Sequence, residues 1–150
     1  MSPAVVCRTF APMAARTEDH RSSIDASWTF PRVVAAAAGA FFTAAGVWAM
    51  ADPESFFDAL ATFDPYNQHL IQDIGAFQIG LGAVLLLACA PRLDGLTVGL
   101  GGVAVGSAAH TVSHVVGSDL GGNPSTDIPV FSLLTVLLVV GAVQQWRSTA

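Results

Sequence analysis

Two pairs of polar residues interrupt the apolar stretches of this 150-residue chain. His69 and Asp73 stand four residues apart, and so do His110 and His114. Side chains four residues apart lie on one face of a helix, one turn from each other. Imidazole and carboxylate groups can bind transition metals, and they can also hydrogen-bond or protonate the oxygens of a small molecule. The two pairs therefore mark a candidate site.

The first interpretation of this site is a metal centre. Together His69, Asp73, His110 and His114 would supply four ligands suited to zinc, copper or iron. The segment HTVSH lacks the glutamate of the H-E-x-x-H pattern, so it offers no general base for peptide hydrolysis. A haem with two histidine ligands would pair His69 with His110 or His114. The latter two share a helix face and cannot reach both sides of one porphyrin.

The second interpretation is a pocket for a small amphipathic molecule such as a quinone. Asp73 and His110 would bind or protonate its oxygens, with Gln72 and Gln78 as neighbouring polar groups. In that case the protein would be a redox-related accessory protein, such as a component of a membrane oxidoreductase, or another small-ligand-binding protein.

The third interpretation is structural. A carboxylate such as Asp73 is costly inside a membrane, and hydrogen bonds to imidazole would offset that cost while holding two helices together. The protein would then be a membrane component without a catalytic site. The residue pattern alone leaves all three interpretations open.

The segments that carry these residues are long and apolar. Hydrophobic residues make up 53% of the chain and charged residues 11%, against about 25% charged in a soluble domain. A helix of about 20 apolar residues crosses a hydrocarbon core of about 30 Å, and four windows are long enough: 31–50, 69–90, 95–117 and 127–146. Backbone groups in lipid must be satisfied within their own segment, which favours helices. We predict an all-α polytopic membrane protein, an up-down bundle of four transmembrane helices within residues 28–147.

The first connection between these windows, residues 51–65, predicts a further short helix. The segment DPESFFDAL offers Asp52 as an N-cap and places Phe56, Phe57 and Leu60 along one face. Such an amphipathic helix suits the membrane interface. At the end of this connection, Asp64 and the following proline are expected to begin the second membrane helix.

The arginines predict the orientation in the membrane. All six lie before or at the start of the first window, between the second and the third, or after the fourth: Arg8, Arg16, Arg21, Arg32, Arg92 and Arg147. The positive-inside rule therefore places both termini in the cytoplasm. Residues 1–27 are expected to form a disordered cytoplasmic tail, and residues 148–150 a short cytoplasmic C-terminus.

This topology predicts where the polar residues lie. His69 and Asp73 are one and two turns inside the second helix, and His114 and His110 are one and two turns from the end of the third. If these two helices are neighbours, His69 meets His114 and Asp73 meets His110 near the outer leaflet.

The composition also bears on partners. The lipid bilayer is the expected environment, and the chain has no clustered basic face of the kind that binds nucleic acid. Small residues four apart, such as Ala76 and Gly80 or Gly102 and Gly106, allow close helix packing. We expect that packing within the bundle, while a homodimer or another membrane-protein partner stays open.

Two segments resemble a known family. NQHLIQDIGAFQIGLGAVLLLA, residues 67–88, followed by HTVSH, residues 110–114, is similar to the DoxX-like superfamily of small bacterial four-helix membrane proteins, in particular its uncharacterised branch. The resemblance covers about residues 30–147 and implies a bacterial inner-membrane protein. Some relatives belong to quinone-linked oxidoreductase assemblies, and others act on aromatic polyketides.

Overall fold

The described part of the protein is entirely helical. The computed structural model describes residues 28–90 and 93–150, and these contain no strand. The helices are α1 (Phe30–Ala51), α2 (Pro53–Leu60), α3 (Gln68–Ala88), α4 (Leu96–Val116) and α5 (Pro124–Thr149). All except α2 are long and apolar enough to cross a membrane. The predicted helical class is confirmed, and so is the presence of four helices that could span a membrane, which indicates a multi-pass membrane protein. The predicted tail, residues 1–27, lies outside the described residues.

The helix starts follow from local hydrogen bonding. Asp52 caps α2, since its Oδ1 accepts a hydrogen bond from the backbone N of Ser55 at 3.2 Å, as the sequence predicted. The expected start of the second membrane helix at Asp64 is wrong. Asn67 caps α3 instead, because its Oδ1 accepts a bond from the backbone N of Leu70 at 3.1 Å.

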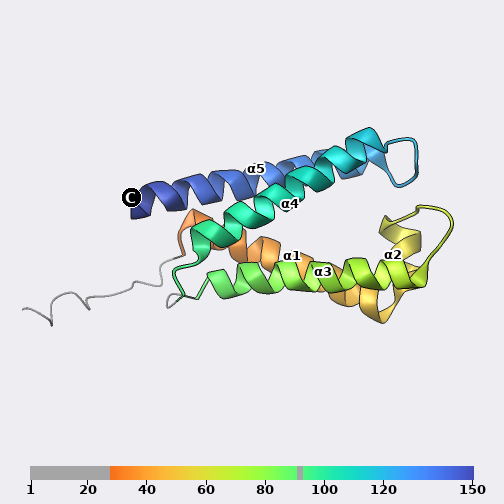
Figure 1. Cartoon of the computed structure of the whole chain (residues 1–150), viewed down its shortest axis with the longest axis horizontal. Helices are drawn as coiled ribbons and strands as arrows, with labels where there is room; N and C mark the ends of the chain where they lie inside the picture. The colour runs from red at the N-terminus through yellow and green to blue at the C-terminus, as the bar shows by residue number, and fades with distance from the viewer. Residues whose placement is uncertain (1–27, 91–92) are drawn as a thin grey trace, which may run out of the picture.

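The four long helices form two pairs. The most extensive contacts are those of α1 with α3 and of α4 with α5, and Figure 1 shows each pair lying side by side. The pairs join each other at the end away from α2, where one apolar cluster includes Ala35 of α1, Leu85 of α3, Leu100 of α4 and Leu138 of α5, all fully buried. Towards α2 the pairs diverge (Figure 1).

Glycines bring α1 and α3 into backbone contact. A Cβ atom added to Gly46 would lie 2.6 Å from the carbonyl oxygen of Gly75, and one added to Gly82 would lie 2.8 Å from that of Gly39. Only glycine allows this approach at both levels of the helix pair. The predicted close packing within the chain is therefore present, but of the glycines predicted to mediate it only Gly99 makes a close contact. Gly80, Gly102 and Gly106 face open space.

The expected packing of α3 against α4 occurs at only one end of the two helices. Their contacts are far fewer than those of α3 with α1, and they include Gly99 of α4, whose added Cβ would lie 2.9 Å from the Cβ of Ala88. At the other end, Ile71 of α3 packs in a second apolar cluster with Ala49 and with Phe56 of α2. The short helix thus covers the divergent end of the α1–α3 pair.

We predict that Gly82→Ala destabilises the fold and Gly80→Ala does not. The new methyl group at position 82 would clash with the α1 backbone, which costs about 1–3 kcal/mol. At position 80 the methyl group meets open space, and replacing glycine in a helix is neutral or stabilises by about 0.4–1 kcal/mol. Equilibrium unfolding of both variants in detergent measures the difference. Equal effects would contradict the glycine-mediated contact.

Candidate ligand-binding site

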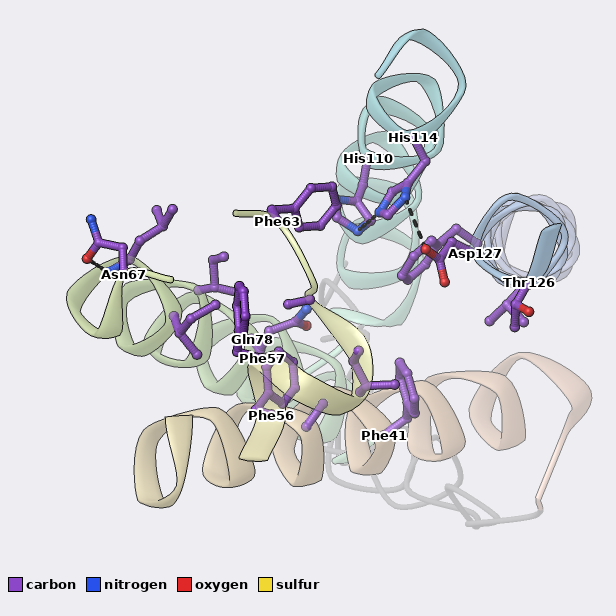
Figure 2. Close-up of a pocket in the computed structure, with 18 of the residues that line it drawn as sticks. Phe41, Phe56, Phe57, Phe63, Asn67, Gln78, His110, His114, Thr126 and Asp127 are labelled. Atoms are coloured by element: carbon purple, nitrogen blue, oxygen red, sulfur yellow. Dashed lines mark hydrogen bonds and ion pairs between the residues drawn. The ribbon is translucent and has the colours of Figure 1, made fainter. Parts of the chain in front are cut away.

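A cavity of about 410 Å³ lies between the two helix pairs at the α2 end (Figure 2). Every helix and the connection between α2 and α3 contribute to its lining. Its walls are largely apolar, and five phenylalanines form much of them: Phe41, Phe56, Phe57, Phe63 and Phe131. The divergence of the helix pairs therefore creates a space enclosed by aromatic side chains.

One corner of the cavity holds a chain of three polar side chains. The Nε2 atoms of His110 and His114 lie 3.2 Å apart, within hydrogen-bond distance. Nδ1 of His114 lies 3.6 Å from Oδ2 of Asp127, an ion pair when the imidazole is protonated. The side chains of His114 and Asp127 are only 12% and 18% exposed. Asp127 is fixed in turn, because its Oδ2 accepts a hydrogen bond from the backbone N of Asn123 at 2.9 Å.

Aromatic rings hold the two imidazoles in place. The ring of Phe131 lies 4.5 Å from that of His110 and 4.9 Å from that of His114, measured between centroids. Phe63 approaches His114 from the other side at 6.2 Å. Such tilted and edge-on arrangements are favourable for aromatic pairs. Figure 2 shows His110, His114 and Asp127 together, with α4 and α5 carrying them.

A second polar group reaches the cavity from the opposite helix pair. Gln78 of α3 lines it, and the Oε1 atom of Gln78 is buried without a hydrogen-bond partner (Figure 2). An unsatisfied buried acceptor costs about 1–3 kcal/mol. A binding site is one setting in which such a group persists, because a ligand can supply the missing donor.

The other predicted site residues of α3 lie outside the cavity. Nε2 of His69 lies 3.5 Å from Oδ2 of Asp73, and the two side chains are 87% and 53% exposed. Gln72 donates instead to the backbone oxygen of Met50 at 3.5 Å. None of these three residues lines the cavity.

The expected convergence of His69 and Asp73 with His110 and His114 is therefore wrong. The reason is the rotation of α3, whose Gly75 packs on α1 while Ile71 faces the cavity. Residues two positions from Ile71 lie about 200° around the helix, on the opposite face. Within the described residues, no group of three or more His, Cys, Asp or Glu side chains could hold a metal ion.

Sequence reasoning missed Asp127 and Phe131 as site residues. Asp127 stands in the first turn of α5, outside the two predicted helices from which the candidate residues came. The short connection from α4 to α5 was the available signal, because it returns the chain to the level of His114.

The cavity is covered at the end of the bundle and open at its sides. Over the end, the backbone N of Gly122 donates to the backbone oxygen of Thr62 at 3.3 Å and joins the two connections there. At the side, Leu70 of α3 lines the cavity while 54% exposed, and His110 of α4 lines it while also exposed. A molecule would therefore enter between α3 and α4, from the surface where lipid would lie.

No family model, curated protein or solved structure matches this chain. The similarity to the DoxX-like superfamily stays a prediction from the two segments that carry it.

We predict that Asp127→Asn destabilises the protein more than Asp73→Asn. The first change removes a charged acceptor that holds a largely buried imidazole and a backbone N–H, a loss of about 1–3 kcal/mol. The second affects an exposed pair within one helix turn, which contributes about 0.5 kcal/mol or less. Thermal unfolding in detergent compares the two variants. A larger loss for Asp73→Asn would contradict this placement of the site.

Proposed function

We propose that the protein binds a small lipophilic molecule with polar oxygens, such as a quinone-type compound, in the cavity at the α2 end. The observation that carries this proposal is the cavity itself: about 410 Å³, with apolar walls and polar groups contributed by both helix pairs. Pockets for small molecules typically enclose about 300–1,000 Å³ and combine apolar walls with a few placed polar groups. As a redox-related or other small-ligand-binding accessory protein, the chain would hold this molecule rather than transform it alone.

We place the protein in a bacterial inner membrane, as an up-down bundle with both termini in the cytoplasm and the site near the outer leaflet. The arginine distribution supports this orientation. Exposed Trp28 and Trp146 lie near one end of the long helices, and exposed Trp48 and Tyr66 near the other, in the manner of interfacial aromatic belts. In this setting α2 lies at the interface, and the resemblance of residues 67–88 and 110–114 to the DoxX-like superfamily supports the same environment.

A four-ligand metal centre and a haem held by His69 find less support in this arrangement. His69 and Asp73 lie on an exposed face of α3, whereas His110 and His114 line the cavity. Each ligand set considered for zinc, copper, iron or haem combines residues of α3 with histidines of α4, so these residues would have to lie close together.

One observation favours the structural alternative. The contact between His114 and Asp127 joins α4 to α5, and the hydroxyl groups of Ser107 and Thr135 join the same two helices at 2.9 Å. Polar contacts of this kind hold membrane helices together without any ligand. On this alternative the protein organises other membrane components, and the cavity stays without a bound molecule.

Ligand-dependent stability distinguishes the two functions. A quinone with a short alkyl tail, such as decylubiquinone, or its reduced form decylubiquinol should raise the unfolding temperature of the protein in nanodiscs. Binding at 100 times the dissociation constant stabilises by about 2.7 kcal/mol. We predict that Ile74→Trp, which fills the cavity, abolishes the increase.

Phe77→Trp is the matched control. Phe77 lies on the same helix, is 77% exposed and does not line the cavity, so this variant should keep the full increase. No stabilisation of the unsubstituted protein by either form, or equal stabilisation of Ile74→Trp, would contradict binding in this cavity and favour the structural alternative.

A further inference from the structure

We infer that the cavity selects a molecule with two hydroxyl groups, a hydroquinone or another lipophilic diphenol, over the corresponding quinone. This inference rests on the proposed function, because it concerns the class of molecule bound in the same cavity. It follows from the hydrogen-bonding character of the polar groups that the two helix pairs contribute.

The position of Asp127 determines which nitrogen atoms of the imidazoles carry hydrogen. A carboxylate only accepts hydrogen bonds, and its Oδ2 faces Nδ1 of His114 at 3.6 Å. This favours the tautomer of His114 with hydrogen on Nδ1. A neutral imidazole carries one N–H, so Nε2 of His114 is then an acceptor.

His110 must therefore act as the donor between the two rings. The 3.2 Å contact between the Nε2 atoms requires a hydrogen atom on one of them, and that atom belongs to His110. Nδ1 of His110 is left with a lone pair. The chain of polar groups that begins at Asp127 thus ends at Nδ1 of His110. This atom is a hydrogen-bond acceptor on a residue that lines the cavity.

Gln78 supplies a second acceptor from the other helix pair. Its Oε1 atom is buried and has no partner, so a donor from a bound molecule would satisfy it. The side-chain donors that line the cavity are the amide nitrogens of Asn67 and Gln78 and the hydroxyl group of Thr126, and Asn67 and Thr126 belong to exposed residues. Among the described residues that line the cavity, the side-chain atom that is buried without a partner is Oε1 of Gln78, and this atom requires a donor.

The chemistry of the ligand follows from these two acceptors. A diphenol can direct one O–H group to Nδ1 of His110 and the other to Oε1 of Gln78, and its ring would lie among the phenylalanines. The oxygens of a quinone carry only lone pairs, so they would leave both acceptors unsatisfied. Sites built to hydrogen-bond a hydroxyl group strongly reject analogues that lack it.

Three compounds of one carbon skeleton test this selectivity: trimethylhydroquinone, its quinone and its dimethyl ether. Their dissociation constants are measured by isothermal titration with the protein in nanodiscs, without oxygen, at about pH 8, where an ordinary imidazole is neutral. We expect the hydroquinone to bind at least about tenfold more tightly than the other two. Gln78→Met should weaken hydroquinone binding by about tenfold and leave quinone binding unchanged, because it removes one acceptor.

Gln72→Met is the matched control, since Gln72 lies outside the cavity and should leave all three constants unchanged. Equal binding of hydroquinone and quinone by the unsubstituted protein would overturn the inference and leave the proposed function intact. Binding of none of the three would overturn both. A hydroquinone preference that persists in folded Gln78→Met would also overturn the inference, because the preference would not come from this acceptor. The comparison within the unsubstituted protein remains decisive even if Gln78→Met does not fold.

Discussion

The close approach of α1 and α3 determines the rest of this structure. Glycines on both helices let the two backbones touch, at Gly46 against Gly75 and at Gly39 against Gly82. Lipid provides little hydrophobic drive between helices, so such van der Waals contact is a main source of association. It also sets the rotation of α3. Ile71 and Gln78 turn towards the interior, and His69 turns away from it.

Much of the fold could be predicted from the sequence. The four spans follow from the length of the apolar windows, and the cap of α2 at Asp52 follows from residue type. The pairing of the helices could not be predicted this way. A short connection requires only that the end of α3 meets the start of α4, and it leaves the remaining length of both helices free to diverge. Glycine spacing was a poor guide, because Gly80 and Gly106 fit the four-residue pattern but face open space, whereas Gly75 and Gly82, which contact α1, stand seven residues apart.

The site, like the fold, could be predicted only in part. Residue type predicts which side chains belong to a site, whereas helix packing determines which of them meet. His110, His114 and Gln78 were predicted as polar groups of a site, and the structure places all three at the cavity. Asp73 was predicted as the acid of the cluster because it lies two turns inside a span, yet Asp127 is the acid beside His114 in the structure. The position of an acid along a helix predicts its depth, whereas its partner depends on which face the neighbouring helix covers. Here α5, and not α3, covers the histidine face of α4.

The central claim is that the histidines of α4 face α5 and not the His69–Asp73 face of α3. Cross-linking of cysteine pairs tests it most directly, in protein whose Cys7 and Cys89 are replaced by serine and which is held in native membranes. A short bifunctional thiol reagent should join cysteines placed at 114 and 127 rapidly, because these side chains are in contact. It should not join cysteines placed at 73 and 110. Rapid cross-linking of 73 to 110, with little between 114 and 127, would contradict this account.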